Sequence, residues 1–271
     1  CARGGLLRSG LAFTQSDISI VTNVSADHLG LKDIDTLEDM ARVKMIVPQS
    51  THKNGFAILN DDDDLVYDMQ NHLDCRIALF SVDSENDRIK KHCADGGWAA
   101  IREDEYLTIC QGKWKTRIGK IRDFPITMDG RAEAMIRNLL PASLAGVLSG
   151  FNHEAIREAL YSFIPSPELT PGRMNIFDFG DVKLMVDYAH NPDGMQMLKK
   201  FLDKTEASVK IGIVGAAGDR RDEDLIEMGQ ISAEIFDEII IRHDEDLRGR
   251  TAEEMTEFLS RGVRQVKPDL P

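Results

Sequence analysis

Short apolar runs alternate with segments of helical periodicity along most of the chain. In the first part, this pattern predicts strands at 17–22, 55–59 and 77–82 and helices at 36–47 and 66–69. Thr36 is the expected N-cap of the longer helix, and Asp39 lies three residues after Thr36. This is the spacing of an N-terminal capping box. Alternating strands and helices of this kind are typical of a mostly parallel sheet covered by helices.

Three later runs, at 98–101, 106–110 and 114–118, alternate apolar and polar residues across short polar turns. They predict an antiparallel meander at the edge of that sheet. Two helices are expected to follow, at 131–148 and 153–163, and Asn152 is a suitable N-cap for the second. The fold class expected here is α/β, with a mostly parallel sheet that carries an antiparallel meander.

Pro165, Pro167 and Pro171 interrupt any regular element and predict a domain boundary, which divides the chain into 1–164 and 165–271. Beyond the boundary the order is strand, strand, helix, followed by strands at 210–214 and 238–241 and helices at 223–235 and 252–261. This order predicts a second, Rossmann-like α/β domain with a mostly parallel sheet.

Composition excludes several classes of function. The chain has 271 residues, 42% of them apolar, and a formal net charge of -13, which argues against a general nucleic-acid binder. It has no signal peptide and no apolar run long enough to span a bilayer. We therefore expect a cytoplasmic location and no membrane partner. The four cysteines lack metal-type spacing and are expected to be reduced thiols. Because the chain starts at Cys1 inside what resembles a motif, we expect a fragment.

The run from Met185 to Gly194 carries the strongest functional signal. An apolar strand, 182–186, ends in Asp187, Tyr188, His190 and Asn191, and Pro192 then opens a helix. Ligands of α/β proteins bind where strand ends meet helix starts, and helix amides favour anions there. A plain turn requires only Gly, Asn or Asp, so this dense polar string favours a functional site.

Two further loops follow the strands of the second part. Small residues at 215–218 allow a tight loop, and Arg220 and Arg221 behind them are suited to clamping phosphate or carboxylate oxygens. The run 242–250 contains Asp244, Glu245, Asp246, Arg248 and Arg250. It reads equally well as an ordinary solvated loop and as a substrate-binding loop.

Three features of the first part remain ambiguous. Asp27 and His28, after a buried strand, are compatible with metal or phosphate binding and equally with an N-capping acid beside a satisfied imidazole. Lys44 lies among apolar helix residues, where a lysine normally extends outward to water, whereas a buried lysine acts as a neutral amine. Arg3-Gly4-Gly5 with Arg8 fits a plain turn at least as well as a ligand-binding backbone. No GxxxxGK[ST] phosphate-binding loop is present in the sequence.

Together, these segments resemble the Mur ligase family of ATP-dependent, amide-forming ligases. Pro171-Gly172-Arg173 followed by the run 187–192 is similar to the opening of that family's C-terminal domain, and Leu59-Asn60-Asp61-Asp62 is similar to its LNxDD motif. The branch of the family that makes cyanophycin is indicated by four more segments, at 3–8, 27–31, 218–222 and 247–250. The resemblance covers essentially the whole chain, in the family's order.

The resemblance implies ATP and Mg2+ as cofactors and assigns roles to residues at matching positions. His28 is expected to help hold magnesium, although a neutral imidazole is an unusual ligand for that ion. Lys44 falls where relatives carry a lysine converted by carbon dioxide to a carbamate, whose oxygens suit a hard cation. His28, Lys44, His190 and Arg220 are therefore the expected catalytic residues.

Further residues are implied to bind the nucleotide or the substrates. Contacts to the nucleotide are expected from Asn138, Arg173, Asp187 and Asn191. Met135 stands where many relatives have a second asparagine. Substrate contacts are expected from Arg3, Arg8, Arg221, Asp244, Glu245, Asp246, Arg248 and Arg250. The three acids of this set are hypothesised to bind a guanidinium group, because a guanidinium needs carboxylates.

The implied reaction joins arginine to aspartate side chains of an acidic polymer, poly-aspartate, in a full-length protein that is a homo-oligomer. Residues 1–164 would then be the later part of the central ATPase domain, without its P-loop, and 165–271 a truncated C-terminal domain. The fragment alone is expected to be inactive. Two alternatives stay open: another ligase of this fold, acting on a folate or a peptidoglycan precursor, and a non-catalytic nucleotide-binding module.

Overall fold

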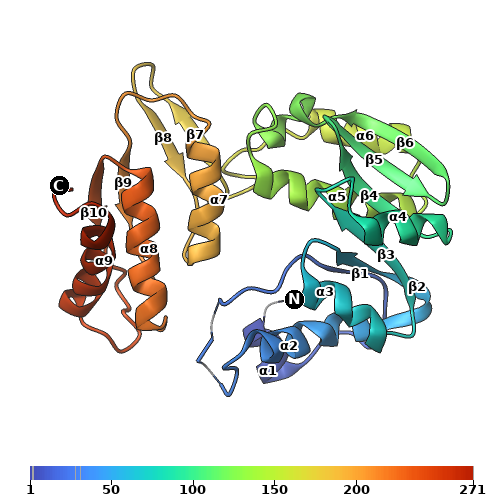
Figure 1. Ribbon diagram of the computed structural model, residues 1–271, viewed down its shortest axis with the longest axis horizontal. Coiled ribbons are helices and arrows are strands. Elements are labelled where there is room, and N and C mark those ends of the chain that lie inside the picture. The colour runs from blue at the N-terminus through green and yellow to red at the C-terminus, as the bar shows by residue number, and fades with distance from the viewer. Residues whose placement is uncertain (2, 28, 31, 271) are drawn as a thin grey trace. The chain divides into compact units, whose positions relative to one another are not determined.

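The structure, a computed structural model, describes residues 1, 3–27, 29–30 and 32–270. The chain divides into two compact units (Figure 1). Unit 1 comprises Cys1–Ala26 and Ile34–Ile164, and unit 2 comprises Asp27–Asp33 and Pro165–Pro271. The second unit therefore starts at the proline-rich segment and also includes a short stretch from the first part of the chain.

Unit 1 is built on one six-stranded sheet in the order β1-β2-β3-β4-β5-β6. The strands are β1 (Ser16–Val21), β2 (Thr51–Asn60), β3 (Arg76–Ser81), β4 (Trp98–Glu103), β5 (Tyr106–Gln111) and β6 (Trp114–Lys120). β1 to β4 run parallel, and β4, β5 and β6 pair antiparallel. The predicted parallel sheet with an antiparallel meander at its edge is confirmed.

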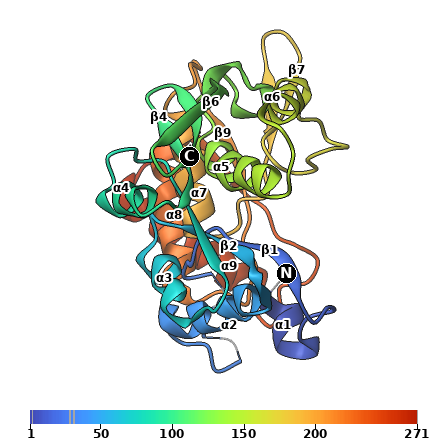
Figure 2. The same ribbon diagram turned by 90° about the vertical axis from the view of Figure 1, so that its right-hand side faces the viewer.

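Helices cover both faces of this sheet (Figure 2). They are α1 (Arg3–Ser9), α2 (Leu37–Gln49), α3 (Asp64–Tyr67), α4 (Asp87–Ala94), α5 (Glu133–Leu148) and α6 (His153–Ser162), with three 3-10 turns, η1 (Asp68–His72), η2 (Ile121–Asp123) and η3 (Pro125–Thr127). Successive side chains of β2 point to opposite faces. Phe56 and Ile58 pack in the core with α5 and α6, whereas Ala57 and Leu59 pack in the core with α2, α3 and α4.

Several local predictions for unit 1 can be compared with the structure. The capping box of Thr36 and Asp39 is present, and the Asn152 side chain caps α6 by accepting a hydrogen bond from the Ala155 amide. The prediction of a plain turn at Arg3-Gly4-Gly5 is wrong, because these residues start helix α1. Helix α4 was not expected, since only Ile89 of its eight residues is buried and the apolar period is missing.

Unit 2 contains β7 (Asn175–Asp178), β8 (Lys183–Val186), α7 (Pro192–Leu202), β9 (Ile211–Val214), α8 (Asp222–Ile235), β10 (Glu238–Ile241) and α9 (Ala252–Val266). The elements occur in the predicted order. β9 and β10 pair in parallel, but β7 and β8 form a separate antiparallel hairpin. In the described part of unit 2 the strands thus form two small sheets, not the single mostly parallel sheet that was expected.

The core of unit 2 lies between the three helices and one face of β9 and β10. Val214, Leu225, Met228 and Leu259 are among its buried members. The other face of this strand pair is apolar and open, since Ile211, Ile213 and Ile240 remain 56%, 66% and 55% exposed.

As for the helices in general, none within the described residues has the length and apolar character needed to cross a lipid bilayer.

Candidate functional site

The first group of candidate residues gathers at the carboxyl ends of β1, β2 and β3. Because these strands are parallel neighbours, the loops that follow them meet at one edge of the sheet. The Asn60 side chain, at the end of β2, donates a hydrogen bond of 2.7 Å from Nδ2 to the Thr22 carbonyl oxygen, just after β1. Asp63 accepts a hydrogen bond of 2.6 Å from the Val24 amide at Oδ2. Two side chains, one at the end of β2 and one in the loop after it, thus hold the loop that follows β1.

Lys44 reaches the same loop from helix α2. Its Nζ donates a hydrogen bond of 2.7 Å to the carbonyl oxygen of Asn23, and the residue as a whole is half-buried. Lys44 also lines a cavity of about 180 Å3 together with Arg3 and Asn23. Lys44 is thus neither fully buried nor extended freely into water, and its amino group is hydrogen-bonded at the carboxyl end of β1.

A magnesium ion sets clear requirements for the residues around Lys44. Mg2+ prefers several oxygen ligands in near-octahedral geometry. Within the described residues, no group of three or more His, Cys, Asp or Glu side chains is arranged to hold a metal. A carbamate on Lys44 would add two oxygens at the cavity, which suits this ion. His28, the other predicted ligand, lies outside the described residues.

The acids that follow Asn60 have separate environments. Asp62 accepts hydrogen bonds from the Ser81 hydroxyl and, at 2.9 Å, from the Val82 amide, so it joins the loop after β2 to the loop after β3. Asp61 is only 2% exposed, and burial raises the pKa of its carboxyl from 3.8 to about 6, against the opposing effect of the Arg88 guanidinium. This is the acid of the motif whose protonation changes near neutral pH.

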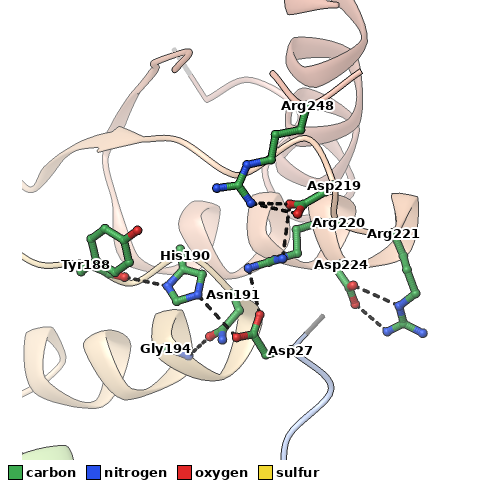
Figure 3. Close-up of polar contacts among 10 residues, drawn as sticks. All are labelled: Asp27, Tyr188, His190, Asn191, Gly194, Asp219, Arg220, Arg221, Asp224 and Arg248. Carbon is green, nitrogen blue, oxygen red and sulfur yellow. Dashed lines mark hydrogen bonds and ion pairs between the residues drawn. The ribbon is translucent and has the colours of Figure 1, made fainter. Parts of the chain in front are cut away.

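The second group of candidate residues lies within unit 2 and centres on Arg220 (Figure 3). Arg220 is 4% exposed, and its guanidinium contacts the Asp27 carboxylate at 3.0 Å and the Asp219 carboxylate at 3.4 Å. The other oxygen of Asp27 lies 3.5 Å from Nε2 of His190. Residues far apart in the sequence therefore meet at one carboxylate.

The His190 imidazole is held at both nitrogens. Its Nδ1 lies 2.9 Å from the Tyr188 carbonyl oxygen, as a donor would, and its Nε2 faces Asp27. The hydrogen bond to Asp27 raises the pKa of His190 above its usual value, against burial and the nearby Arg220 charge. His190 is thus kept nearer to its protonated form, which suits contact with an anion.

The two arginine-containing loops of unit 2 are tied to each other. Nη1 of Arg248 contacts both oxygens of Asp219, at 3.0 and 2.9 Å. Arg250 donates to the backbone carbonyl oxygens of Gly218 and Arg220, each at 2.8 Å. The predicted tight loop is present: a Cβ atom added at Gly218 would lie 1.9 Å from the Leu247 carbonyl oxygen. Only glycine allows the two loops to approach this closely.

Of the four residues predicted to bind the nucleotide, Asp187 and Asn191 accept hydrogen bonds from backbone amides. Asp187 accepts hydrogen bonds from the amides of Met174 (2.9 Å) and Ala189 (2.8 Å), and Asn191 caps α7 by accepting from the Gly194 amide at 2.8 Å. Both side chains therefore also shape the strand-to-helix turn. Asn138 on α5 is exposed, and Arg173 is exposed with its guanidinium 5.3 Å from the Tyr188 ring.

The remaining predicted substrate residues are distributed more widely. Arg8 is exposed and donates to the Gly4 carbonyl oxygen within α1. Arg221 forms a two-point contact with Asp224, at 3.0 and 2.6 Å. Among the three acids, Asp244 pairs with Arg242, Asp246 accepts from the Arg248 amide, and Glu245 is exposed. All three acids are exposed, and Asp246 is the one that also binds the backbone of its own loop.

Sequence reasoning did not select several residues that the structure places at these sites. Asp27 was noted as a motif residue but not as the partner of Arg220 and His190. Asn60, Asp63 and Asp219 were not selected either, although Asn60 ends β2 and the other two lie in the loops after β2 and β9. The available signal was the position at a strand's carboxyl end, which applies to acids and amides as much as to arginines.

Comparison with known proteins places both units in one family. Residues 4–116 match the model of the Mur ligase middle domain, and residues 172–268 match the model described as Mur ligase, glutamate ligase domain. The chain is 45% identical to the cyanophycin synthetase of Nostoc sp. over 99% of its own length, and 45% identical to that of Synechocystis sp. over 98%. It spans about 30% of the length of these relatives.

Solved structures support the same fold. MurF from Acinetobacter baumannii superposes with a TM-score of 0.66 at 17% identity, covering 93% of this chain and 50% of that one. FolC from E. coli, in complex with DHPP and ADP, gives 0.64 at 19% identity, covering 91% and 52%. The resemblance read from the motifs is thus confirmed: the chain belongs to the Mur ligase family and matches the models of its middle and C-terminal domains.

Proposed function

We propose that this chain is part of an ATP-dependent carboxylate–amine ligase that makes cyanophycin by joining arginine to aspartate side chains of a poly-aspartate backbone. The observation that carries the proposal is the 45% identity to cyanophycin synthetases along 99% of the chain. Because the chain spans about 30% of those relatives, the activity belongs to the full-length protein, which we propose to be a cytoplasmic homo-oligomer.

The proposed reaction has two steps. The γ-phosphoryl group of ATP is transferred to the acceptor carboxylate, which gives an acyl phosphate and ADP. The amine then attacks the carbonyl carbon, a C–N bond forms, the bond to phosphate breaks, and the amine proton passes to solvent. Such chemistry depends mostly on positioning and on electrostatic stabilisation of the phosphoryl group. Bound Mg2+ supplies charge neutralisation, with His28 and a Lys44 carbamate as its proposed ligands from this chain.

The remaining residues are assigned by what their side chains contact. Arg220 is buried against Asp27 and Asp219, so we propose that it sets the charge around the Asp27 carboxylate together with His190. Arg173, Arg8 and Arg3 are less buried and are proposed to meet anionic parts of the nucleotide or of the acidic acceptor. Asn138 is proposed to contact the adenine.

The test uses the full-length protein that contains this chain. Phosphate release from ATP is measured with a short aspartate-based acceptor, with and without arginine. Release that requires both substrates supports the proposal, and Lys44→Met is then expected to abolish it. Release with a folate or peptidoglycan precursor and another amino acid would assign a sister ligase. ATP binding without turnover under any pairing would assign a non-catalytic module.

A further inference from the structure

Three consecutive residues after β1 are each held by a different side chain. Thr22 accepts from Asn60, Asn23 accepts from Lys44, and Val24 donates to Asp63. All three contacts are made to backbone atoms, at 2.7, 2.7 and 2.6 Å. The segment Thr22–Val24 is therefore fixed in position.

Asn60 uses both ends of its amide. Nδ2 donates to the Thr22 carbonyl oxygen, while Oδ1 accepts a hydrogen bond of 3.0 Å from the Asp62 amide. Asn60 is 3% exposed, so water does not compete for either contact. The orientation of the amide is set by one donor and one acceptor, and an acid of the same shape would not satisfy both. Asn60 therefore fixes the first residue of the segment.

Asp63 uses its two oxygens in different directions. Oδ1 accepts from the Val66 amide at 3.1 Å and caps α3, while Oδ2 accepts from the Val24 amide. The cap is an ordinary role for an aspartate at a helix start. The hydrogen bond from the Val24 amide is an additional contact, to the loop that follows β1. The two functions of this carboxylate can be separated by substitution.

The anchored carbonyl oxygen of Asn23 decides where the Lys44 amino group lies. A lysine side chain loses much of its rotamer freedom when it is ordered. A mobile acceptor would not hold it. Because both neighbours of Asn23 are fixed, its carbonyl oxygen offers Lys44 a stationary acceptor at the edge of the cavity.

We propose that Asn60 and Asp63 are positioning residues that hold the Thr22–Val24 segment so that the Asn23 carbonyl oxygen orients the nitrogen of Lys44. The inference deepens the proposed function and rests on it for its catalytic consequence. When Lys44 reacts with CO2, the amine forms an N–C bond and loses one proton to solvent. The carbamate nitrogen keeps one N–H, which continues to donate to Asn23. The two new oxygens are then held in one direction, as a hard cation requires.

Asp62 provides a matched control in the same loop. It is adjacent to Asp63 and also uses both carboxylate oxygens, but its contacts run to Ser81 and Val82 on the opposite side of β2. Asp62→Asn therefore disturbs a comparable number of hydrogen bonds without touching the Thr22–Val24 segment. Any effect shared by Asp62→Asn and the Asp63 variant would be a general loss of packing.

Two variants of the full-length protein test the tether directly. Asp63→Ser keeps a hydroxyl that can cap α3 but cannot also reach Val24. Asn60→Asp keeps the shape and the acceptor for the Asp62 amide but removes the donor to Thr22. In both variants, amide hydrogen exchange in the peptide covering 22–27 should become about tenfold faster or more, because local opening becomes easier. Unchanged exchange in both variants, or equal acceleration in Asp62→Asn, would overturn the inference.

A second readout concerns Lys44 itself. The protein is equilibrated with 13C-labelled bicarbonate, and the carbamate carbon is followed by NMR, with Lys44→Arg to identify the signal. We expect the signal to fall several-fold in both tether variants and to persist in Asp62→Asn. The ligase kcat should fall about tenfold to a hundredfold with little change in the KM for ATP. A tether variant with full carbamate and unchanged kcat would overturn the role at Lys44, and so would a wild-type protein without the signal.

The two proposals fail in different ways. If exchange and the carbamate signal respond as expected but the wild-type protein has no ligase turnover, the tether stands and the proposed function is wrong. If turnover is normal in the wild-type protein and the tether variants behave like Asp62→Asn in every readout, the ligase stands and the tether is wrong.

Discussion

Nε2 of His190 lies 3.5 Å from Oδ2 of Asp27, while the other oxygen of the same carboxylate contacts the buried guanidinium of Arg220. One carboxylate thus contacts two basic side chains. Its hydrogen bond with His190 is the largest cause of the raised pKa of that imidazole. The charge state of this histidine therefore depends on a residue near the start of the chain.

Asp27→Ala is expected to lower the pKa of His190 to its ordinary value or below. Burial and the positive charge of Arg220 remain, and both disfavour the imidazolium. The measurement is an NMR titration of the His190 ring. Asp219→Asn is the control, because it removes a partner of Arg220 but does not contact His190. A pKa that stays raised after Asp27→Ala would contradict the assignment.

Asp61 predicts how stability changes with pH. Its folded pKa, about 6, lies above the ordinary value of 3.8, so the folded state holds the proton more tightly. This contribution is fully present below pH 4 and is lost as the pH rises through 6. One pKa unit corresponds to about 1.4 kcal/mol, so at most about 3 kcal/mol is involved.

Asp61→Asn should flatten this pH dependence and stabilise the protein at pH 8 relative to the wild type, because a neutral amide replaces a buried carboxylate. The free energy of unfolding is measured by denaturant at pH 4, 6 and 8. Asp83→Asn, at another position after a strand, gives the baseline for a charge change. Equal slopes for wild type and Asp61→Asn between pH 4 and 6 would count against the raised pKa.

Gly218→Ala should destabilise unit 2 by about 2 to 4 kcal/mol, because the added Cβ would lie 1.9 Å from the Leu247 carbonyl oxygen and force the two loops apart. Gly5→Ala in α1 is the matched control. Its Cβ meets nothing within 4 Å, and alanine favours a helix by about 1 kcal/mol. Thermal unfolding of both variants provides the comparison, and a Gly218 variant as stable as the control would refute the close approach.

Cys93 should react with iodoacetamide faster than the other cysteines of the core. A hydrogen bond from the Cys110 thiol lowers the pKa of Cys93, whereas burial is the main cause that raises the pKa of Cys75. The thiolate is the reactive form. Mass spectrometry gives the rate at each site. Cys110→Ala removes the donor and should slow the reaction of Cys93, while Cys75→Ala should leave it unchanged.

Asp244→Asn combined with Glu245→Gln should raise the KM for arginine of the full-length enzyme about tenfold, because a guanidinium loses its carboxylate partners. Asp246 is spared, since it accepts the Arg248 amide and shapes the loop. The KM for ATP serves as the internal control. An unchanged KM for arginine would remove these acids from the substrate site.

Strands were predictable because apolar runs flanked by polar turns have few other structures available. The six strands of unit 1 follow those runs. Thr36 and Asn152 cap α2 and α6, as expected for these residue types before a helix. Helix α1 was not predictable in this way, since Gly4 and Gly5 oppose a helix on propensity and Leu6 is its one buried residue.

The candidate site was predictable by residue type but not by partner. Asp62 and Asp63 are neighbours in the sequence, yet they reach loops on opposite sides of β2. Only the order of the parallel strands decides this. The contact of Asp27 with Arg220 depends on tertiary structure and leaves no local pattern. By contrast, the capping role of Asn191 is readable from Pro192 at the first position of the helix.

The open face of β9 and β10 has a practical consequence. Ile211, Ile213 and Ile240 present branched apolar side chains to water on a short parallel strand pair. Such a surface favours aggregation. A sample of this chain should therefore form larger species as its concentration increases, and replacing Ile213 with threonine, which keeps the strand preference, should extend the range of concentrations over which the protein can be handled.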